Sequence, residues 1–276
     1  ITALMLLLVW VGGLVGGRTG MIVAFAIGLG LNFLNFWFSS KAILKAYGAR
    51  ILEPGELQWL QDDIRDMTSK AGMPMPKIAF IDKDAPNAFA TGRSPEHAVV
   101  AITRGALQVM DRRQVRAVMG HELAHVKNRD MLTMTLVAGV VSAIGMLAMM
   151  ARFGAIFGGG RNEGGNPFAL IAVAILAPLM AGMAQFAISR SREYAADAGG
   201  AGLSEDPAAL ADALESLHRA IPRAAPMTQN GATAHMMIAN PFAGMKVGQL
   251  FSTHPDPNER IRRLREMATG RRDGAR

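Results

Sequence analysis

The sequence predicts a mainly α-helical integral membrane protein that also carries a small β-sheet. Half of its 276 residues are hydrophobic, and the mean hydropathy is +0.21, a value that soluble domains rarely reach. Long uncharged runs alternate with segments of mixed composition, and one mixed segment contains short runs rich in β-forming residues. These observations favour about four transmembrane helices and a water-exposed part with a small sheet.

Charge and cysteine content narrow the class further. The net charge is +7 and the isoelectric point is about 10.2. The basic residues lie next to the apolar runs, which is typical of segments beside a lipid bilayer, so we expect lipid and not nucleic acid as a partner. The absence of cysteine excludes disulfides and thiolate metal sites, so any metal ligand must be a histidine or a carboxylate.

The N-terminal segment, residues 1–40, is expected to form a transmembrane hairpin. Residues 1–17 and 19–40 carry no charge, and Arg18 alone separates them. A cleaved signal peptide is the competing interpretation of the first run, but the second apolar run follows immediately. The sequence begins at Ile1 and not at Met, so we expect that some N-terminal residues are missing.

Residues 41–130 form a mixed segment and are expected to be exposed to water. Pro54 and Gly55 open a helix that is expected to reach Lys70. Three strands and a further helix capped by Asp111 should follow. The expected strands are Lys77–Asp82, Asn87–Gly92 and His97–Thr103.

Residues 131–189 are expected to form a second transmembrane hairpin. Residues 131–150 and 164–189 carry no charge, and a glycine-rich loop joins them. A hairpin buried in a protein core is the alternative interpretation.

Residues 190–276 should be water-exposed again. Asp206 and Pro207 start a helix that ends near Ala220, residues 221–250 have the composition of a loop, and Glu259–Met267 should form a short basic helix.

The distribution of basic residues predicts the orientation of the spans. Seven lysines and arginines near the span ends fall on the side of the water-exposed parts, and three fall on the other side, which places the water-exposed parts in the cytoplasm. The seven are Lys41, Lys45, Arg50, Lys127, Arg129, Arg190 and Arg192, and the three are Arg18, Arg152 and Arg161.

The central motif is His121-Glu122-Leu123-Ala124-His125. On a helix, His121 and His125 are four residues apart and share a face, so both imidazoles can bind one metal ion. Glu122 lies beside that face, where a base for the attacking water is needed. Because such a pattern also arises by chance, the motif alone leaves a purely structural role open.

A catalytic metal needs a third protein ligand, and Glu193 is the candidate. Glu193 and Asp197 are also four residues apart, so Glu193 can bind the metal while Asp197 accepts a hydrogen bond from a ligand histidine. A solvated helix face with Arg190 and Arg192 is the alternative. Because His125 precedes the third apolar run and Glu193 follows the fourth, an antiparallel hairpin would bring the two motifs together.

Several motifs in order along nearly the whole chain make it resemble the HtpX-type membrane zinc metalloproteases, relatives of the CAAX prenyl endopeptidases. Besides the apolar runs and the two motifs above, they are Pro86–Gly92 (PNAFATG), Thr253-His254-Pro255 and Arg260. The resemblance implies a zincin-like catalytic domain in which His121, His125 and Glu193 bind one zinc ion and Glu122 acts as the general base.

The same resemblance implies roles for the remaining motifs. His254 would stabilise the oxyanion of the tetrahedral intermediate, with Arg260 in support. Asn87, Ala88, Phe89 and Ala90 would form an edge strand that binds the substrate backbone.

The resemblance implies an endopeptidase for misfolded or damaged membrane proteins, which would work in membrane-protein quality control at the cytoplasmic face of a bacterial inner membrane. The alternatives are a CAAX-type protease acting on prenylated proteins and a membrane scaffold whose metal site has no turnover. Neither the natural substrates nor the oligomeric state follow from the sequence.

Overall fold

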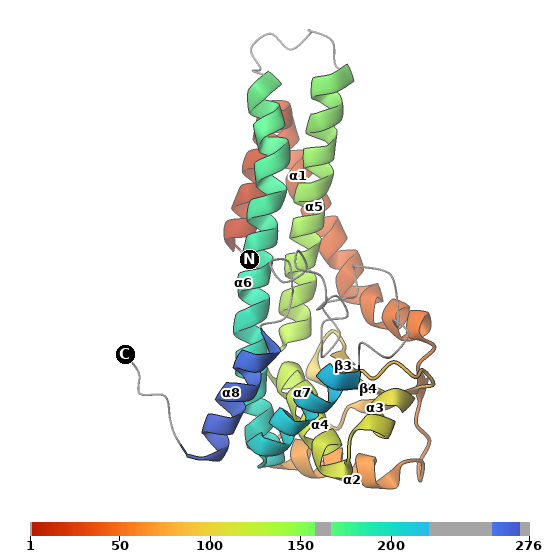
Figure 1. Ribbon diagram of the computed structural model, residues 1–276. Helices are drawn as coiled ribbons and strands as arrows, with labels where there is room; N and C mark the ends of the chain where they lie inside the picture. The colour runs from red at the N-terminus through yellow and green to blue at the C-terminus, as the bar shows by residue number, and fades with distance from the viewer. Residues whose placement is uncertain (1, 158–166, 221–255, 271–276) are drawn as a thin grey trace. The chain divides into compact units, whose positions relative to one another are not determined.

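The structure is a computed structural model that describes residues 2–157, 167–220 and 256–270, and most of them are helical (Figure 1). The helices are α1 Thr2–Tyr47, α2 Gln58–Lys70, α3 Arg104–Val109, α4 Arg112–Lys127, α5 Asp130–Phe157, α6 Pro167–Ser204, α7 Pro207–Ala220 and α8 Pro257–Ala268, with a short 3-10 helix at Pro95–His97. The strands are β1 Arg50–Ile51, β2 Lys77–Ile81, β3 Ala88–Thr91 and β4 Val99–Thr103. The mainly helical class predicted from the sequence is therefore confirmed.

The chain divides into two compact units. One unit comprises Ile1–Ser39 and Leu132–Ile188, and the other comprises Ser40–Met131 and Ser189–Arg276. We call the first the apolar unit and the second, because it carries the motifs of the family resemblance, the catalytic unit. Their boundaries fall inside α1, α5 and α6, so each of these helices contributes residues to both units.

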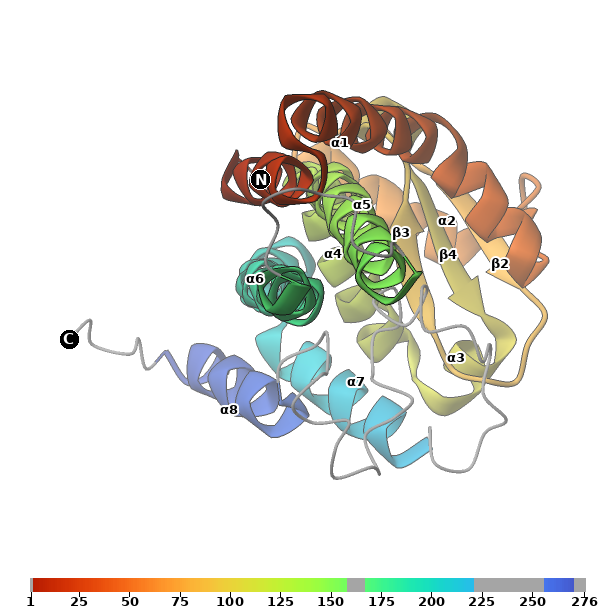
Figure 2. The same ribbon diagram turned by 90° about the horizontal axis from the view of Figure 1, so that it is seen from above.

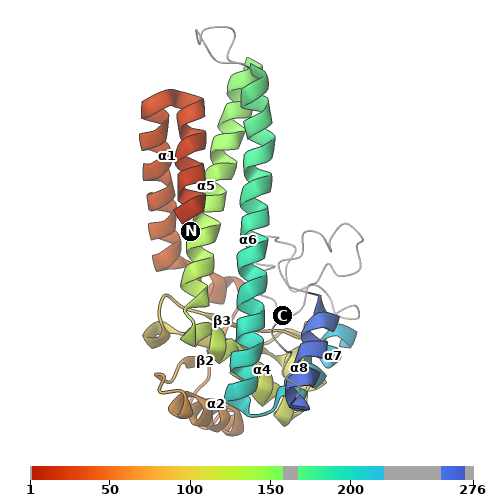
Figure 3. The same cartoon turned by 90° about the vertical axis from the view of Figure 1, so that its left-hand side faces the viewer.

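In the apolar unit, α1 is bent into two arms that lie side by side (Figure 3). The bend is at Gly16 and Gly17, and Gly17 adopts a φ of 57°, which glycine reaches without steric cost. The arms approach closely at Gly12 and Gly20, where a Cβ on Gly20 would lie 2.1 Å from the carbonyl oxygen of Gly12. The two uncharged runs on either side of Arg18 thus fold as a helical hairpin.

The apolar unit has its own core, in which both arms of α1 pack with α5 and α6 around buried residues such as Leu8, Ile144 and Ala181. Among the described residues, two helical stretches are long and apolar enough to cross a membrane, Thr2–Phe38 and Asp130–Met149. The first stretch contains the bend and so includes both arms. Length and composition agree with membrane helices, but the expected count of about four spans is not confirmed.

The catalytic unit contains a four-stranded sheet in the order β1-β2-β4-β3. The central strands β2 and β4 are parallel, with Ala79 opposite Ala101, whereas β1 and β3 run antiparallel to their neighbours. β3 is an edge strand, with Phe89 opposite Ala101. The register of β3 decides which of its backbone N–H and carbonyl groups hydrogen-bond to β4 and which face away from the sheet.

Both faces of this sheet are covered, because successive side chains of β4 alternate between two clusters. Val100 and Ile102 join the main core, which α2, α4, α7 and α8 complete with buried side chains such as Ile64, Leu123 and Leu264. On the other face, the residues of β4 pack with Tyr47 and Phe89. Figure 2 shows α7 and α8 side by side, and this packing holds α8 on the catalytic unit.

The structure departs from the sequence expectations at several element ends. α2 begins at Gln58 and not at Pro54, because Leu57 has a left-handed φ of 43°. His97 belongs to the 3-10 helix, so β4 starts two residues later at Val99. Strand β1 and helix α3, which Thr103 caps, were not predicted. The predicted segment 221–250 lies outside the described residues.

Candidate metal centre

The site is built on α4, whose start is encoded locally. The side chain of Asp111 accepts a hydrogen bond from the backbone N–H of Gln114, and the side chain of Gln114 accepts one from the N–H of Asp111, as the sequence predicted for a helix cap here. One turn of this helix separates His121 from His125, and their Nε2 atoms lie 3.1 Å apart.

Helix α6 brings the second motif to α4 through glycine. A Cβ on Gly200 would lie 2.5 Å from the backbone N and Cα of His121, and a Cβ on Gly199 would lie 2.9 Å from the Cβ of Ala124. Without these Cβ atoms the two backbones can approach closely, which is the usual role of small residues between helices. Glu193 and Asp197, both earlier on α6, are thereby carried to the histidines.

Glu193 completes a set of three potential ligands. Its Oε1 lies 3.5 Å from Nε2 of His125, and its Oε2 lies 3.8 Å from Nε2 of His121. One donor atom from each of the three residues falls within 4.8 Å of the others, a spacing that can hold a metal ion. Glu193 and His121 are buried, so the set lies within the protein and not on a solvated surface.

A carboxylate lies close to the Nδ1 atom of each histidine, the ring nitrogen that does not face the potential metal position. Nδ1 of His121 lies 3.0 Å from Oδ1 of Asp197, as expected from the sequence. Nδ1 of His125 lies 2.9 Å from Oδ2 of Asp130, a contact that was not predicted from the sequence. A carboxylate at Nδ1 favours the tautomer that keeps its proton there and leaves the Nε2 lone pair for a metal.

The donor set fits a divalent metal ion. With both Nδ1 atoms protonated, two Nε2 lone pairs and a carboxylate converge, and a cation between them relieves their repulsion. Burial lowers the pKa of His125, but the hydrogen bond to Asp130 and the charges of Glu193 and Glu122 outweigh it and raise that pKa to about 9. The site therefore favours positive charge, which a metal ion can supply.

Arg260 of α8 is buried against the same carboxylates. Its Nε and one terminal nitrogen donate to the two carboxylate oxygens of Asp197 at 2.8 and 2.7 Å, and its other terminal nitrogen lies 3.3 Å from Oε2 of Glu193. Burial alone would raise the pKa of Asp197, but Arg260 and His121 lower it to about 2. Arg260 thus keeps Asp197 ionised and fixes its orientation toward His121.

Glu122 lies outside the ligand set and is itself buried. Burial raises the pKa of its carboxyl group, an effect that the nearby histidines partly oppose. The backbone N–H of Ala90 donates a hydrogen bond to Glu122. This contact places the carboxylate beside the edge strand β3.

The register of β3 shows which of its backbone groups face away from the sheet. The N–H of Thr103 donates to the carbonyl of Asn87 at 3.0 Å, so residues 87, 89 and 91 bond to β4. The backbone groups of Ala88 and Ala90 point to the other side. The side chains of Asn87, Ala88, Phe89 and Ala90 are all buried, so the backbone of the outer edge, and not these side chains, is what β3 can offer to a peptide.

Comparison with known proteins identifies the family. The model of peptidase family M48 matches residues 54–268. The chain belongs to peptidase family M48.

Two M48 relatives, each named a protease HtpX homolog, match nearly the whole chain. The one from Paraburkholderia phytofirmans is 48% identical and covers 98% of this chain and 95% of its own length, and the one from Ralstonia pickettii is 49% identical over 96% and 93%. A crystal structure of S. mikatae Ste24p aligns with a TM-score of 0.48 at 19% identity and covers 88% of this chain and 64% of that one. The family match and the two HtpX homologs show that this M48 protein is a metallopeptidase.

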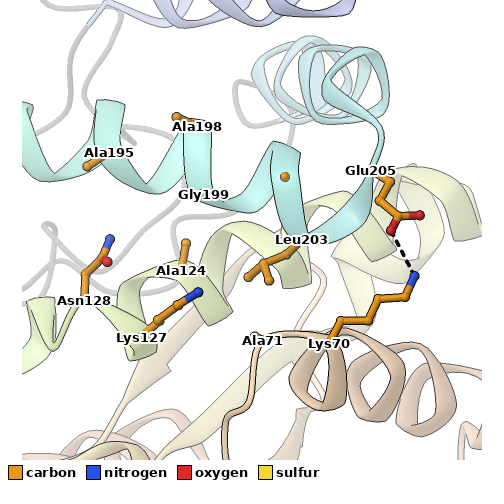
Figure 4. A pocket seen from close by; sticks show the side chains of 11 residues that line it. Lys70, Ala71, Ala124, Lys127, Asn128, Ala195, Ala198, Gly199, Leu203 and Glu205 are labelled. Carbon is orange, nitrogen blue, oxygen red and sulfur yellow. Dashed lines mark hydrogen bonds and ion pairs between the residues drawn. The ribbon is translucent and has the colours of Figure 1, made fainter.

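A groove of about 540 Å³ lies next to α4 and α6, the helices of this M48 chain that carry the potential metal ligands (Figure 4). Lys70, Lys127 and Glu205 are among its lining residues, together with the small residues Ala124 and Gly199. It contains none of the three potential ligands, so the groove does not reach the metal centre. His254, which the sequence assigned to the oxyanion, lies outside the described residues.

Proposed function

We propose that the chain is a membrane-bound, zinc-dependent endopeptidase that cleaves misfolded or damaged membrane proteins. The observation that carries the proposal is the convergence of His121, His125 and Glu193 with Glu122 beside them. Two imidazoles and one carboxylate with an open fourth position are the usual ligand set of catalytic zinc. The full-length similarity to proteins named protease HtpX homologs supports the same function.

In this proposal the protein side chains bind the zinc ion, orient its ligands and transfer the proton. When bound, zinc would polarise the scissile carbonyl and activate water. Glu122 takes the proton of the attacking water on a carboxylate oxygen and delivers it to the departing amine. Its raised pKa helps it to hold that proton between the two steps. Asp197 orients His121, and Arg260 orients Asp197 and Glu193.

The substrate would bind as an extended strand along the outer edge of β3, residues Asn87–Ala90. The N–H and carbonyl of Ala88 and the carbonyl of Ala90 point to this edge, and pairing with them recognises a peptide backbone of any sequence. Because Ala90 also contacts Glu122, a peptide bound there would lie beside the base. We assign His254, by the family resemblance, to stabilisation of the oxyanion, with Arg260 nearby in the sequence as its support.

We further propose that residues 1–40 and 131–189 form two transmembrane hairpins and that residues 41–130 and 190–276 form the catalytic part on the cytoplasmic side of a bacterial inner membrane. Two apolar stretches, Thr2–Phe38 and Asp130–Met149, support membrane insertion. The excess of basic residues at the ends of the spans supports the orientation.

The test is hydrolysis by the purified full-length chain. Wild-type protein should contain one zinc per chain and cleave casein, and a chelator should remove both. Glu122→Gln should keep zinc but lose about 100- to 10,000-fold in turnover, because only the base is removed. Glu53→Gln, which removes a charge from an exposed position of the catalytic unit, is the matched control and should cleave normally.

Wild-type turnover by Glu122→Gln would refute the mechanism, and a wild-type protein that binds zinc without cleaving any unfolded protein would favour a scaffold. A preference for prenylated peptides over the same peptides unmodified would favour the CAAX-type reaction.

A further inference from the structure

The link between α4 and α5 is a tight turn that folds Asp130 back onto the metal-binding helix. α4 ends at Lys127, Asn128 has a helical φ of −78°, and Arg129 has a φ of 55°. A left-handed conformation is uncommon for a residue other than glycine and persists only where surrounding contacts hold it. The turn ends at Asp130, the first residue of α5.

The contacts of Asp130 explain what holds this turn. Its Oδ2 lies 2.9 Å from Nδ1 of His125, and its Oδ1 accepts a hydrogen bond from Arg192 at 2.9 Å. Only 3% of Asp130 is exposed, so its charge has left water and depends on these two donors. Arg192 directly precedes the potential ligand Glu193 on α6. The ion pair of Asp130 with Arg192 therefore links His125 to the segment of α6 that carries Glu193.

We propose that Asp130 is a positioning residue for the metal ligand His125 and that Arg192 acts on His125 through Asp130. This inference rests on the proposed metal site. Asp130 keeps the proton of His125 on Nδ1 and stops the ring from rotating, so that Nε2 presents its lone pair toward His121 and Glu193. Arg192 holds the carboxylate in the orientation that His125 needs.

The two histidines are thus oriented by parallel devices that differ in burial. His121 is held by Asp197 and the buried Arg260, whereas His125 is held by Asp130 and Arg192, whose side chain is 38% exposed. Because Asp130 is also the first residue of α5, the orientation of His125 depends on where that helix begins.

An amide cannot replace the carboxylate of Asp130. Both of its partners, Nδ1–H of His125 and the guanidinium of Arg192, are donors, and each uses a different carboxylate oxygen. Asparagine has one acceptor oxygen and one donor nitrogen, so it can satisfy only one of them. Asp130→Asn therefore changes the hydrogen bonding while it keeps the shape of the side chain.

The experiment is a zinc titration of the metal-free, full-length protein in detergent, with a competing chromophoric chelator. Asp130→Asn should lower zinc affinity about 10- to 100-fold, the usual effect of losing such a partner. Arg192→Ala should cause a smaller loss, and the double variant should bind zinc no more weakly than Asp130→Asn alone, since Arg192 acts through Asp130. Glu205→Gln, which breaks the exposed ion pair with Lys70, is the matched control and should leave the affinity unchanged.

Thermal unfolding of the metal-free variants separates positioning from a structural role. If Asp130 only starts α5, Asp130→Asn should lower the unfolding temperature while zinc affinity stays at the wild-type value, and the inference is overturned. Should Asp130→Asn fail to fold, the half-exposed Arg192→Ala still decides the matter, because unchanged zinc affinity in that variant contradicts its proposed action. A wild-type protein that binds no zinc would instead defeat the proposed function itself.

Discussion

Replacing Gly200 by alanine should disturb the candidate metal centre, although Gly200 is not itself a potential metal ligand. The added Cβ would lie 2.5 Å from the backbone N and Cα of His121, where ordinary contacts begin at 3.4 Å. Backbone atoms cannot swing aside, so α4 and α6 must separate locally by about 1 Å. Glu193 is carried by α6 and the histidines by α4, and metal–ligand distances tolerate only about 0.2 Å.

We therefore expect Gly200→Ala to lower the free energy of unfolding by about 1–3 kcal/mol, the usual cost of overpacking. Turnover should fall on the order of 100-fold, as for other misplacements of this size. The assay is thermal unfolding of the full-length protein in detergent, together with zinc content after dialysis and casein cleavage.

Gly202→Ala is the matched control. It lies on the same helix with nothing within 4 Å of the new Cβ, so alanine there should stabilise the helix by up to about 1 kcal/mol. If Gly200→Ala matches Gly202→Ala in stability and zinc content, the two helices do not need this close approach and the reasoning fails.

Three further predictions address charge, topology and the oxyanion. Asp197→Asn should destabilise the metal-free protein at neutral pH by about 2 kcal/mol, because the pKa of Asp197 in the folded protein, about 2, lies below the ordinary value of 3.8. In thermal unfolding at different pH values, the stability difference between wild type and variant should shrink as the pH falls from 3.8 through 2. A difference that does not change with pH would contradict the pairing of Asp197 with Arg260. Because the chain has no native cysteine, a single cysteine introduced at Gly159 can be labelled specifically. It should react with membrane-impermeant reagents only from the periplasmic side, and labelling from the cytoplasm would show that residues 131–189 do not cross the membrane. His254→Ala should lower kcat about 100- to 1,000-fold with zinc content unchanged; loss of zinc would make His254 a ligand.

The elements that could be predicted from the sequence are those encoded by a few neighbouring residues. The cap at Asp111, the spacing of His121 and His125, and the helix carrying Glu193 and Asp197 all follow from short patterns, and each lies where it was expected. A capping box and an i, i+4 face depend on only one turn of helix, so a few neighbouring residues suffice to predict them.

Asp130 shows why some of the site was missed. It is five residues after His125, a spacing that does not share a helix face, and it reaches the histidine only because Arg129 turns the chain with a positive φ. A non-glycine residue in that conformation has no sequence signature. The meeting of Arg260 with Asp197 was missed for a related reason, since 63 positions separate them and only the packing of α8 on α7 joins them.

The sequence by itself determined which chemical groups the chain can offer, namely two histidines on one helical face, an adjacent glutamate, two more carboxylates on another face, and apolar runs long enough for a bilayer. Only the tertiary structure decided how these groups combine. The contact of α4 with α6 at Gly200 brings Glu193 to the histidines, the register of β3 turns the backbone of Ala90 toward Glu122, and α8 buries Arg260 against Asp197. The physical reason is that helical periodicity acts over one or two turns, whereas the approach of two backbones depends on side-chain volumes and charges from distant parts of the chain.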